Sequence, residues 1–364
     1  MMLFFEAAGP RIGWCLWGAG GTSRPRGAAP VEGALPGPDR PGDLHRALDE
    51  AGMPDAAVYL LANGGTEIVQ DLLPLTAEAL ERVGRCCATW PESNGALADV
   101  ARTWSGRLPQ VPHYVASETA FFAGLPDVAR LYALPELQAA RDGATLPLPA
   151  FRRFGAHGFC HAWVWAEAQA RLGPGARRLV SVYLGDAPDV AALRDGRALE
   201  TTAGFTTTEG LISASRPGEL DPDIVAILLG SGLAPADLRR LLCCESGLAA
   251  LIGPGAGLKD ALASGAPGAA RARRVLLHQL LKAIGGCLAV LGGADGLAFA
   301  VPEADASVDA FVDALCASLA FVGVRRAGEH EPGALADGAI PALVLPYVRW
   351  DVLARRVAAR MGKE

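Results

Sequence analysis

The sequence lacks a long uncharged apolar run. No stretch reaches the roughly 18 to 20 uncharged residues that a membrane-spanning helix needs. The nearest candidate, residues 283–301, contains five glycines and Asp295, and we interpret it as a buried helix followed by a strand. The apolar run at the amino terminus has no basic region ahead of it and contains Glu6, unlike a secretory signal. These features predict a cytosolic protein without a membrane partner.

The sequence also lacks a surplus of basic residues, and it lacks the C-x-x-C spacing of cysteines. The formal net charge is −6, and both signs are spread along the chain. This balance argues against a nucleic-acid partner, because proteins that bind nucleic acids usually present a strong basic surplus or stripe. The eight cysteines include the adjacent pairs Cys86–Cys87 and Cys243–Cys244 but no C-x-x-C spacing. Adjacent cysteines are poor disulfide partners, so we interpret the cysteines as reduced core residues.

Predicted strands and helices alternate through the first half of the chain. Strands are expected over residues 3–6, 12–17, 57–61 and 112–116, and helices over residues 44–51, 77–87 and 96–104. The stretch 18–42 is rich in Gly, Pro and Ala and is expected to form an irregular loop or a partly disordered insert. Alternation at these lengths predicts an α/β domain, and 364 residues leave room for two domains.

The second half of the chain repeats this pattern. A strand over 178–183 is followed by a hairpin of strands 189–194 and 197–200, joined by the favoured tight-turn pair Asp195–Gly196. The later elements are expected as helices over 222–229, 234–243, 269–291, 307–322 and 348–359, and as strands over 297–301 and 342–345. Each half opens on antiparallel strands and then alternates strand and helix, which predicts a duplicated architecture of two domains with a cleft between them.

Basic and glycine residues gather in the string RRFGAHGFCHAWV. Gly155 and Gly158 flank His157, and glycines at such places let the backbone approach a ligand closely. The apolar spacing from Phe159 onward predicts a helix, so His157 would precede a helix N-terminus, where free N–H groups favour anions. A loop histidine that bonds a neighbouring carbonyl is the alternative. We interpret His161, one turn into the helix, as structural.

Arg216 stands immediately before Pro217–Gly218, on a predicted loop ahead of the helix that begins near Pro222. An arginine on a rigid turn is suited to bind a phosphate or carboxylate through two hydrogen bonds, although an ordinary surface arginine is the alternative. Upstream, the string TTAGFTTTEG contains five hydroxyl residues and two glycines, and it either faces a phosphate or forms a polar turn. Cations gathered around flexible backbone point to an anionic small-molecule ligand.

These strings resemble the central signatures of the acetate kinase family. Further segments are similar to that family in register: ESGLAALIGPGAGLKDAL, KAIGGCLAVLGGADGLAFAV and IPALVLPYVRWDVLARRVAAR. The resemblance covers nearly the whole chain and is weakest in its first third. It implies an α/β chain with the duplicated actin-like (ribonuclease H-like) kinase fold. The implied domains span residues 1–147 and 148–346, with a closing helix at 347–364 that packs back on the first domain.

The resemblance also implies an activity, namely phosphoryl transfer between ATP and a short-chain carboxylate with Mg²⁺, by a homodimer. Catalysis of this kind consists mostly of positioning and of charge neutralisation. His157 would stabilise the transition state, Arg216 would hold the carboxylate and the transferring group, and Glu118 matches a catalytic aspartate. The resemblance implies contacts to nucleotide phosphate or to metal for six more residues: Gly185, Asp186, Lys259 and Asp260 for phosphate, and Glu6 and Asp305 for metal.

Several of these positions depart from the family pattern. Leu61 stands where the family has an arginine, a cation that can be worth roughly a thousandfold or more in rate. Glu6 lies near an asparagine position without the serine run that should follow it. Asp186–Ala187 replaces a phosphate-cradling Asn-Gly, Tyr183 replaces a histidine, and the loop 301–307 has no glycine. A degenerate member acting as a binding or scaffold protein is therefore the alternative. A sugar or glycerol kinase is a third possibility, which rests on fold analogy alone.

Overall fold

The computed structural model describes residues 1–8, 11–18, 31–35, 44–135, 138–141, 144–147, 151–327 and 338–362. Most of the loop predicted over residues 18–42 lies outside these residues. By its internal contacts the chain divides into two compact units. Unit 1 comprises Met1–Ala123, Ala133–Phe159 and Val348–Glu364, and unit 2 comprises Gly124–Tyr132 and Cys160–Tyr347.

These units differ from the predicted domains in two places. The main boundary between the two units falls between Phe159 and Cys160, whereas the predicted domains meet at residues 147–148. The segment Gly124–Tyr132, which lies within the first predicted domain, belongs to unit 2. The segment from Val348 belongs to unit 1, on which the closing helix was expected to pack. In that helix, Asp351 accepts a hydrogen bond from Nε1 of Trp17 at 2.6 Å. The division into domains itself stays a prediction.

Unit 1 contains a six-stranded sheet with the order β3-β2-β1-β4-β6-β5. Its strands are β1 (Met2–Ala8), β2 (Arg11–Trp17), β3 (Val31–Leu35), β4 (Ala56–Leu61), β5 (Leu72–Pro74) and β6 (His113–Ser117). The first three strands pair antiparallel, β4 and β6 continue the sheet in parallel with β1, and β5 closes the edge antiparallel to β6. The prediction of irregular loop is wrong for residues 31–35, because pairing with β2 holds them in a strand.

Unit 2 contains a second six-stranded sheet, with the order β11-β10-β9-β12-β14-β13. Its strands are β9 (Arg178–Tyr183), β10 (Asp189–Arg194), β11 (Arg197–Thr201), β12 (Gly296–Val301), β13 (Val324–Arg326) and β14 (Ile340–Pro346). Three antiparallel strands are again followed by parallel ones, and only the edge strand β13 differs, since it runs parallel to β14. Two sheets with the same strand order confirm the predicted duplication.

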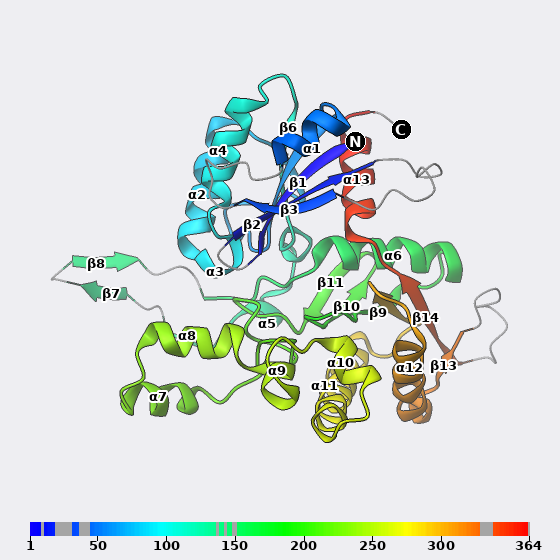
Figure 1. Cartoon of the computed structure of the whole chain (residues 1–364). Helices are drawn as coiled ribbons and strands as arrows, with labels where there is room; N and C mark the ends of the chain where they lie inside the picture. The colour runs from blue at the N-terminus through cyan, green and yellow to red at the C-terminus, as the bar shows by residue number, and fades with distance from the viewer. Residues whose placement is uncertain are drawn as a thin grey trace. The chain divides into compact units, whose positions relative to one another are not determined.

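Helices complete each unit (Figure 1). Unit 1 contains α1 (Leu44–Ala51), α2 (Ala77–Thr89), α3 (Pro91–Asn94), α4 (Leu97–Arg107), the 3₁₀ turn η1 (Ala120–Phe122) and α13 (Arg349–Arg360). It also contains the strand pair β7 (Gln138–Arg141) and β8 (Ala144–Pro147). Unit 2 contains α5 (Asp127–Arg130), α7 (Pro222–Gly230), α8 (Pro235–Cys244), α9 (Gly247–Ile252), α10 (Leu258–Ala263), α11 (Pro267–Leu291), α12 (Ala306–Ser318) and η2 (Ala320–Val322). Helix α6 (Gly158–Leu172) begins in unit 1 and continues in unit 2.

The two residues at the tip of the β10–β11 hairpin determine the type of its turn. Asp195 and Gly196 have φ angles of 52° and 77°, which are both left-handed. A two-residue turn with positive φ at both positions matches the right-handed twist of the flanking strands, and Asp-Gly is among the pairs that adopt it most readily. The predicted turn pair is confirmed.

Helix α11 carries one apolar face of the core of unit 2. Its buried residues Ala272, Leu276, Leu280 and Ile284 recur every four positions and join the same cluster as Phe299 of β12. By length and composition, α11 is also the one helix among the described residues that could cross a membrane. A core helix passes the same test, and α11 buries one face in the cluster described above.

The substitution Phe299→Ala tests the core of unit 2. Phe299 is fully buried in β12, whose neighbours β9 and β14 pair with it on both sides. Removing the ring leaves a cavity, so we expect the free energy of unfolding in urea to fall by about 3–5 kcal/mol. The matched control is Phe321→Ala, because Phe321 is 84% exposed and should change stability by less than about 0.5 kcal/mol. Equal effects of the two substitutions would contradict this placement of the core.

Candidate active site

In unit 1, the end of β6 meets the start of α6. Glu118 follows β6, and its backbone carbonyl accepts the N–H of Gly158 at 3.0 Å. Its carboxylate oxygen Oε2 accepts the N–H of Phe159 at 3.3 Å. Since His157 immediately precedes these two residues, the fold brings Glu118 and the His157 turn together, two of the three residues predicted to be catalytic.

The backbone around His157 is tightly constrained. A Cβ atom at Gly158 would lie 2.1 Å from the carbonyl oxygen of Glu118, so glycine is required there. His157 is half-buried and has a φ of 52°, which is uncommon for a residue other than glycine. Such conformations concentrate at functional sites. The turn opens the 15-residue helix α6, whose N-terminal end favours negative charge.

Burial changes the acidity of Glu118. The residue is 6% exposed, and loss of water raises the pKa of its carboxyl group to about 7, although hydrogen bonds from the backbone of Phe159 and Gly158 oppose the shift. The carboxyl group therefore titrates near neutral pH. The backbone N–H of Glu118 donates to the carbonyl of Leu61 at 3.0 Å. Leu61 itself is fully buried at the end of β4 and supplies no charge at this position.

In unit 2, Arg216 lies on a loop whose backbone is held in place. Its N–H donates to Oγ of Ser213 at 3.1 Å, and its carbonyl accepts the N–H of Ser213 at 3.0 Å. Gly247, at the start of α9 with a φ of 70°, packs directly on this loop. A Cβ atom at Gly247 would lie 2.7 Å from the backbone nitrogen of Arg216 and 2.2 Å from the carbonyl oxygen of Ser213.

The side chain of Arg216 is half-buried, and its Nη1 donates to the backbone carbonyl of Thr207 at 3.0 Å. Burial lowers the pKa of the guanidinium from its usual value. Within the described parts of the chain, no carboxylate pairs with this guanidinium. An arginine held by a carbonyl and lacking a counter-ion is suited to bind an external carboxylate or phosphate.

The residues predicted to contact nucleotide phosphate also come together in unit 2. The carboxylate of Asp186, in the turn after β9, accepts the N–H of Leu258 at the start of α10 at 2.7 Å. Asp260 accepts the N–H of Gly257 at 2.9 Å, and Nζ of Lys259 lies 3.9 Å from a carboxylate oxygen of Glu303. Gly185, next to Asp186, packs against Tyr183, because a Cβ atom there would lie 2.6 Å from the hydroxyl oxygen of that residue.

Carboxylates outnumber cations in this cluster. Asp186, Asp260, Glu303 and Asp305 are four acids beside the single ammonium of Lys259. A bare phosphate would be repelled there, whereas a phosphate that carries its own cation would be tolerated. Asp305 caps α12: its carboxylate accepts hydrogen bonds from the side chain and backbone of Ser307 and from the backbone of Val308, and these bonds lower its pKa.

Glu6, the other predicted metal ligand, forms an ion pair with Arg349 at the start of α13. Both side chains are 32% exposed, and burial lowers the pKa of Arg349 to about 10. A metal role would require Glu6 to give up this partner and Asp305 to give up its cap. Among the described residues, no group of three His, Cys, Asp or Glu could hold a metal ion. The side chains in the described parts of the chain do not fit a magnesium ion held by the protein alone.

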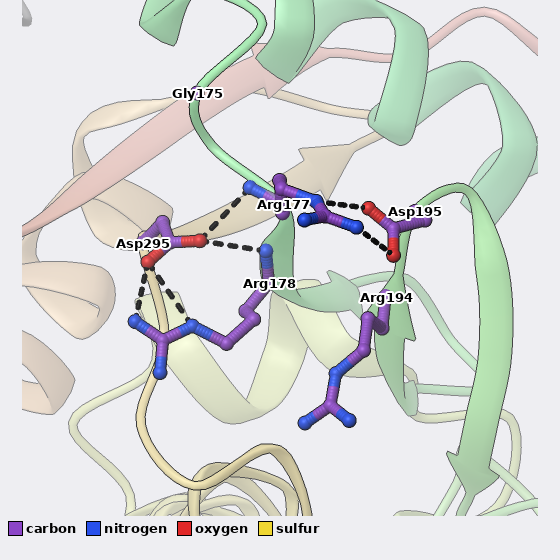
Figure 2. A pocket seen from close by; sticks show the side chains of 6 residues that line it. All are labelled: Gly175, Arg177, Arg178, Arg194, Asp195 and Asp295. Carbon is purple, nitrogen blue, oxygen red and sulfur yellow. Dashed lines mark hydrogen bonds and ion pairs between the residues drawn. The ribbon is translucent and has the colours of Figure 1, made fainter.

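A cavity of about 310 Å³ lies elsewhere in unit 2, at the start of β9 (Figure 2). It is lined by Gly175, Arg177, Arg178, Arg194, Asp195 and Asp295. Figure 2 shows that Arg177 pairs with Asp195 and that Arg178 pairs with Asp295. Arg194 donates to the carbonyl of Leu291, at the end of α11, at 2.7 Å. These charges tie structural elements together, and none of the predicted site residues lines the cavity.

Sequence reasoning missed two residues that bear on the candidate site. Arg349 follows a predicted strand in the string PYVRWD, but nothing in that string indicates Glu6 as its partner. Tyr132 donates a hydrogen bond to the carboxylate of Glu209 across 77 positions of sequence. No local pattern signals either contact, because both join segments that only the tertiary fold brings together.

The duplicated sheets define the actin-like fold, and solved structures agree. The structure is similar to the acetate kinase of Porphyromonas gingivalis, with a TM-score of 0.78, 21% identity and coverage of 99% of both chains. It is also similar to a propionate kinase from Francisella tularensis, with a TM-score of 0.81, 19% identity and coverage of 97% of this chain and 98% of that one. The predicted fold class is confirmed.

The sequence comparisons identify the family. The acetokinase family matches residues 57–337. The acetate kinase of Deinococcus deserti is 32% identical over 308 residues, which are 80% of this chain and 74% of that protein. The acetate kinase of Kocuria rhizophila is 31% identical over 333 residues, which are 87% of this chain and 79% of that protein. The chain belongs to the acetokinase family.

The raised pKa of Glu118 predicts how stability depends on pH. The folded protein holds this proton more tightly than the unfolded chain, whose pKa is the usual 4.5. The stabilisation is therefore fully present below about pH 4.5 and is lost as the pH rises through about 7, a change of about 3 kcal/mol. Glu118→Gln should remove this part of the pH dependence, as measured by urea denaturation at about pH 5 and about pH 8.

The control for this measurement is Glu303→Gln, which changes a carboxylate whose side chain is 78% exposed. That variant should keep the pH dependence of the unmodified protein. If Glu118→Gln kept it too, the buried carboxyl group would not be its source.

Proposed function

We propose that this protein transfers a phosphoryl group between ATP and a short-chain carboxylate such as acetate or propionate, giving ADP and an acyl phosphate. The observation that carries the proposal is Arg216, a half-buried cation without a carboxylate partner among the described residues. It lies within the part of the chain that matches the acetokinase family, in a string whose resemblance to that family predicts an anion-binding arginine. The named relatives are acetate kinases, and a neighbour in structure is a propionate kinase. The comparisons lend no support to the degenerate alternative.

In the proposed reaction, a carboxylate oxygen of the acid forms a bond to the γ-phosphorus of ATP while the bond from that phosphorus to the bridging oxygen of ADP breaks. No proton needs to move, so the protein must chiefly position the reactants and neutralise charge. We assign binding of the carboxylate and the transferring group to Arg216. We assign stabilisation of the transferring phosphoryl oxygens to His157.

Glu118 has a positioning role in this proposal. Its carbonyl and carboxylate bond the two residues that follow His157, which fixes the turn that carries the histidine. A carboxylate buried beneath a phosphate-binding turn would oppose an incoming anion. The raised pKa of Glu118 reduces that repulsion, because near neutral pH the group is partly protonated.

The nucleotide is proposed to arrive as its magnesium complex, with the ion held by phosphate oxygens and water. Magnesium commonly binds proteins in this way, through substrate phosphates and only one or two carboxylates. The acidic surroundings of Lys259 support this form of the nucleotide, since they disfavour a phosphate without its cation. We propose that the nucleotide phosphates bind near Gly185, Asp186, Lys259 and Asp260. We also propose that the protein is cytosolic, since ATP is available there.

The activity test is the formation of acyl hydroxamate from magnesium ATP and acetate, propionate or butyrate in the presence of hydroxylamine. His157→Ala and Arg216→Ala should each lower kcat/KM by about a hundredfold or more, because each removes charge stabilisation of the transition state. The matched control is Arg194→Ala, which also removes an arginine of unit 2 that donates to a backbone carbonyl. It should retain full activity. Absence of product with all three acids at high enzyme concentration would reject the proposed function.

We also propose that two copies of the chain associate through α7. This nine-residue helix buries none of its side chains, and Ile227 is 68% exposed between the exposed Ile224 and Leu229. Ile227→Glu should therefore lower the mass measured by light scattering from that of a dimer to that of a monomer. Val128→Glu, at a residue that is 96% exposed on α5, is the control and should leave the dimer intact. A monomeric unmodified protein would contradict the proposal.

A further inference from the structure

The hydroxyl group of Tyr132 bonds both ends of the threonine-rich turn 205–209. It accepts the backbone N–H of Phe205 at 2.9 Å and donates to the carboxylate of Glu209. One oxygen atom therefore fixes the backbone where the turn begins and the side chain where it ends. A further bond inside the turn runs from the N–H of Thr208 to Oγ1 of Thr206 at 3.2 Å.

The carboxylate of Glu209 and the hydroxyl group of Tyr132 also lie close to the backbone of Gly204. A Cβ atom at Gly204 would lie 1.9 Å from the carboxylate oxygen of Glu209 and 2.7 Å from the hydroxyl oxygen of Tyr132. The carboxylate and the hydroxyl group thus lie directly on the backbone of Gly204, where any larger residue would displace them.

The middle of the same turn holds Arg216. The carbonyl of Thr207 accepts the hydrogen bond from Nη1 of the guanidinium at 3.0 Å, and this is the bond that orients the side chain. Thr207 lies between Phe205 and Glu209, the two residues that Tyr132 bonds. The position of the Thr207 carbonyl, and with it the direction of the guanidinium, therefore depends on the hydroxyl group of Tyr132.

We propose that Tyr132 is a positioning residue, which orients the guanidinium of Arg216 through the turn 205–209. This inference rests on the proposed function, since it specifies how the anion-binding arginine of that site is held. Tyr132 is the last residue of Gly124–Tyr132, a segment that packs within unit 2 although the chain before and after it belongs to unit 1. Tyr132 itself touches neither the carboxylate nor the nucleotide in this proposal.

Hydrogen exchange tests the structural half of the inference without using activity. Tyr132→Phe removes the acceptor of the Phe205 N–H and the donor to Glu209 while it keeps the aromatic ring. Backbone exchange of a peptide that covers residues 203–210, followed by mass spectrometry, should become faster by about tenfold or more in the variant. Unchanged exchange in this peptide would overturn the inference, whether or not the protein is a kinase.

Kinetics test the functional half. Because a misplacement of about 1 Å can cost about a hundredfold in rate, Tyr132→Phe should lower kcat by about tenfold to a hundredfold and leave the KM for ATP within about twofold. The matched control is Tyr59→Phe, which removes a tyrosine hydroxyl that bonds Nδ1 of His113 at 2.9 Å in unit 1. That variant should keep the kcat of the unmodified protein. An equal loss in both variants would overturn the inference.

The combination with Arg216→Ala distinguishes an indirect role from an independent one. If Tyr132 acts through Arg216, then Tyr132→Phe in the Arg216→Ala background should lower kcat by less than about twofold further. Effects that multiply would show that Tyr132 acts by another route and would overturn the inference. If the unmodified protein forms no acyl phosphate, the proposed function fails, while hydrogen exchange still decides whether Tyr132 holds the turn.

Discussion

Parallel pairing within each sheet is the constraint on which both parts of the candidate site depend. In unit 2, β9 and β12 pair in register so that Tyr183 lies opposite Ala300, and the N–H of Leu184 continues the ladder to the carbonyl of Ala300. The chain segments that follow these strands must therefore leave the sheet at the same edge. One segment carries Gly185 and Asp186, and the other carries Glu303 and Asp305. Parallel pairing of β4 with β6 places Leu61 and Glu118 at the corresponding edge of unit 1.

Close backbone contacts hold the loops that carry the proposed catalytic groups. Gly158 packs on the carbonyl of Glu118, and Gly247 packs on the backbone of the Arg216 loop. At both places a Cβ atom would overlap with backbone that cannot move independently, so the glycines keep His157 and Arg216 within narrow limits. Positioning of this kind is what phosphoryl transfer requires from a protein.

Two positions depart from the pattern that the resemblance to the family predicts. Leu61 is buried where an arginine is expected, and Glu6 pairs with Arg349 within unit 1. The acidic side chains around Lys259 disfavour a phosphate without a cation. Among the described residues of the proposed site, Arg216 is the cation that remains without an acidic partner. The proposed chemistry therefore depends on how its guanidinium is oriented. For this reason, the hydrogen bonds of Tyr132, which we propose orient this guanidinium, matter for the proposed activity.

The sequence by itself determined the duplicated alternation of strands and helices, the Asp195–Gly196 turn and the family, because each follows from local patterns or from strings of adjacent residues. It also indicated His157 and Arg216, since glycines and turns beside a cation are visible locally. The strand at residues 31–35 was missed, because its pairing with β2 and not its composition holds it extended. Only the tertiary structure decided that Glu6 pairs with Arg349, that Asp186 caps α10 and that Tyr132 holds the turn before Arg216. These contacts join residues far apart in the chain, and a local pattern carries no information about which distant group will meet a given side chain.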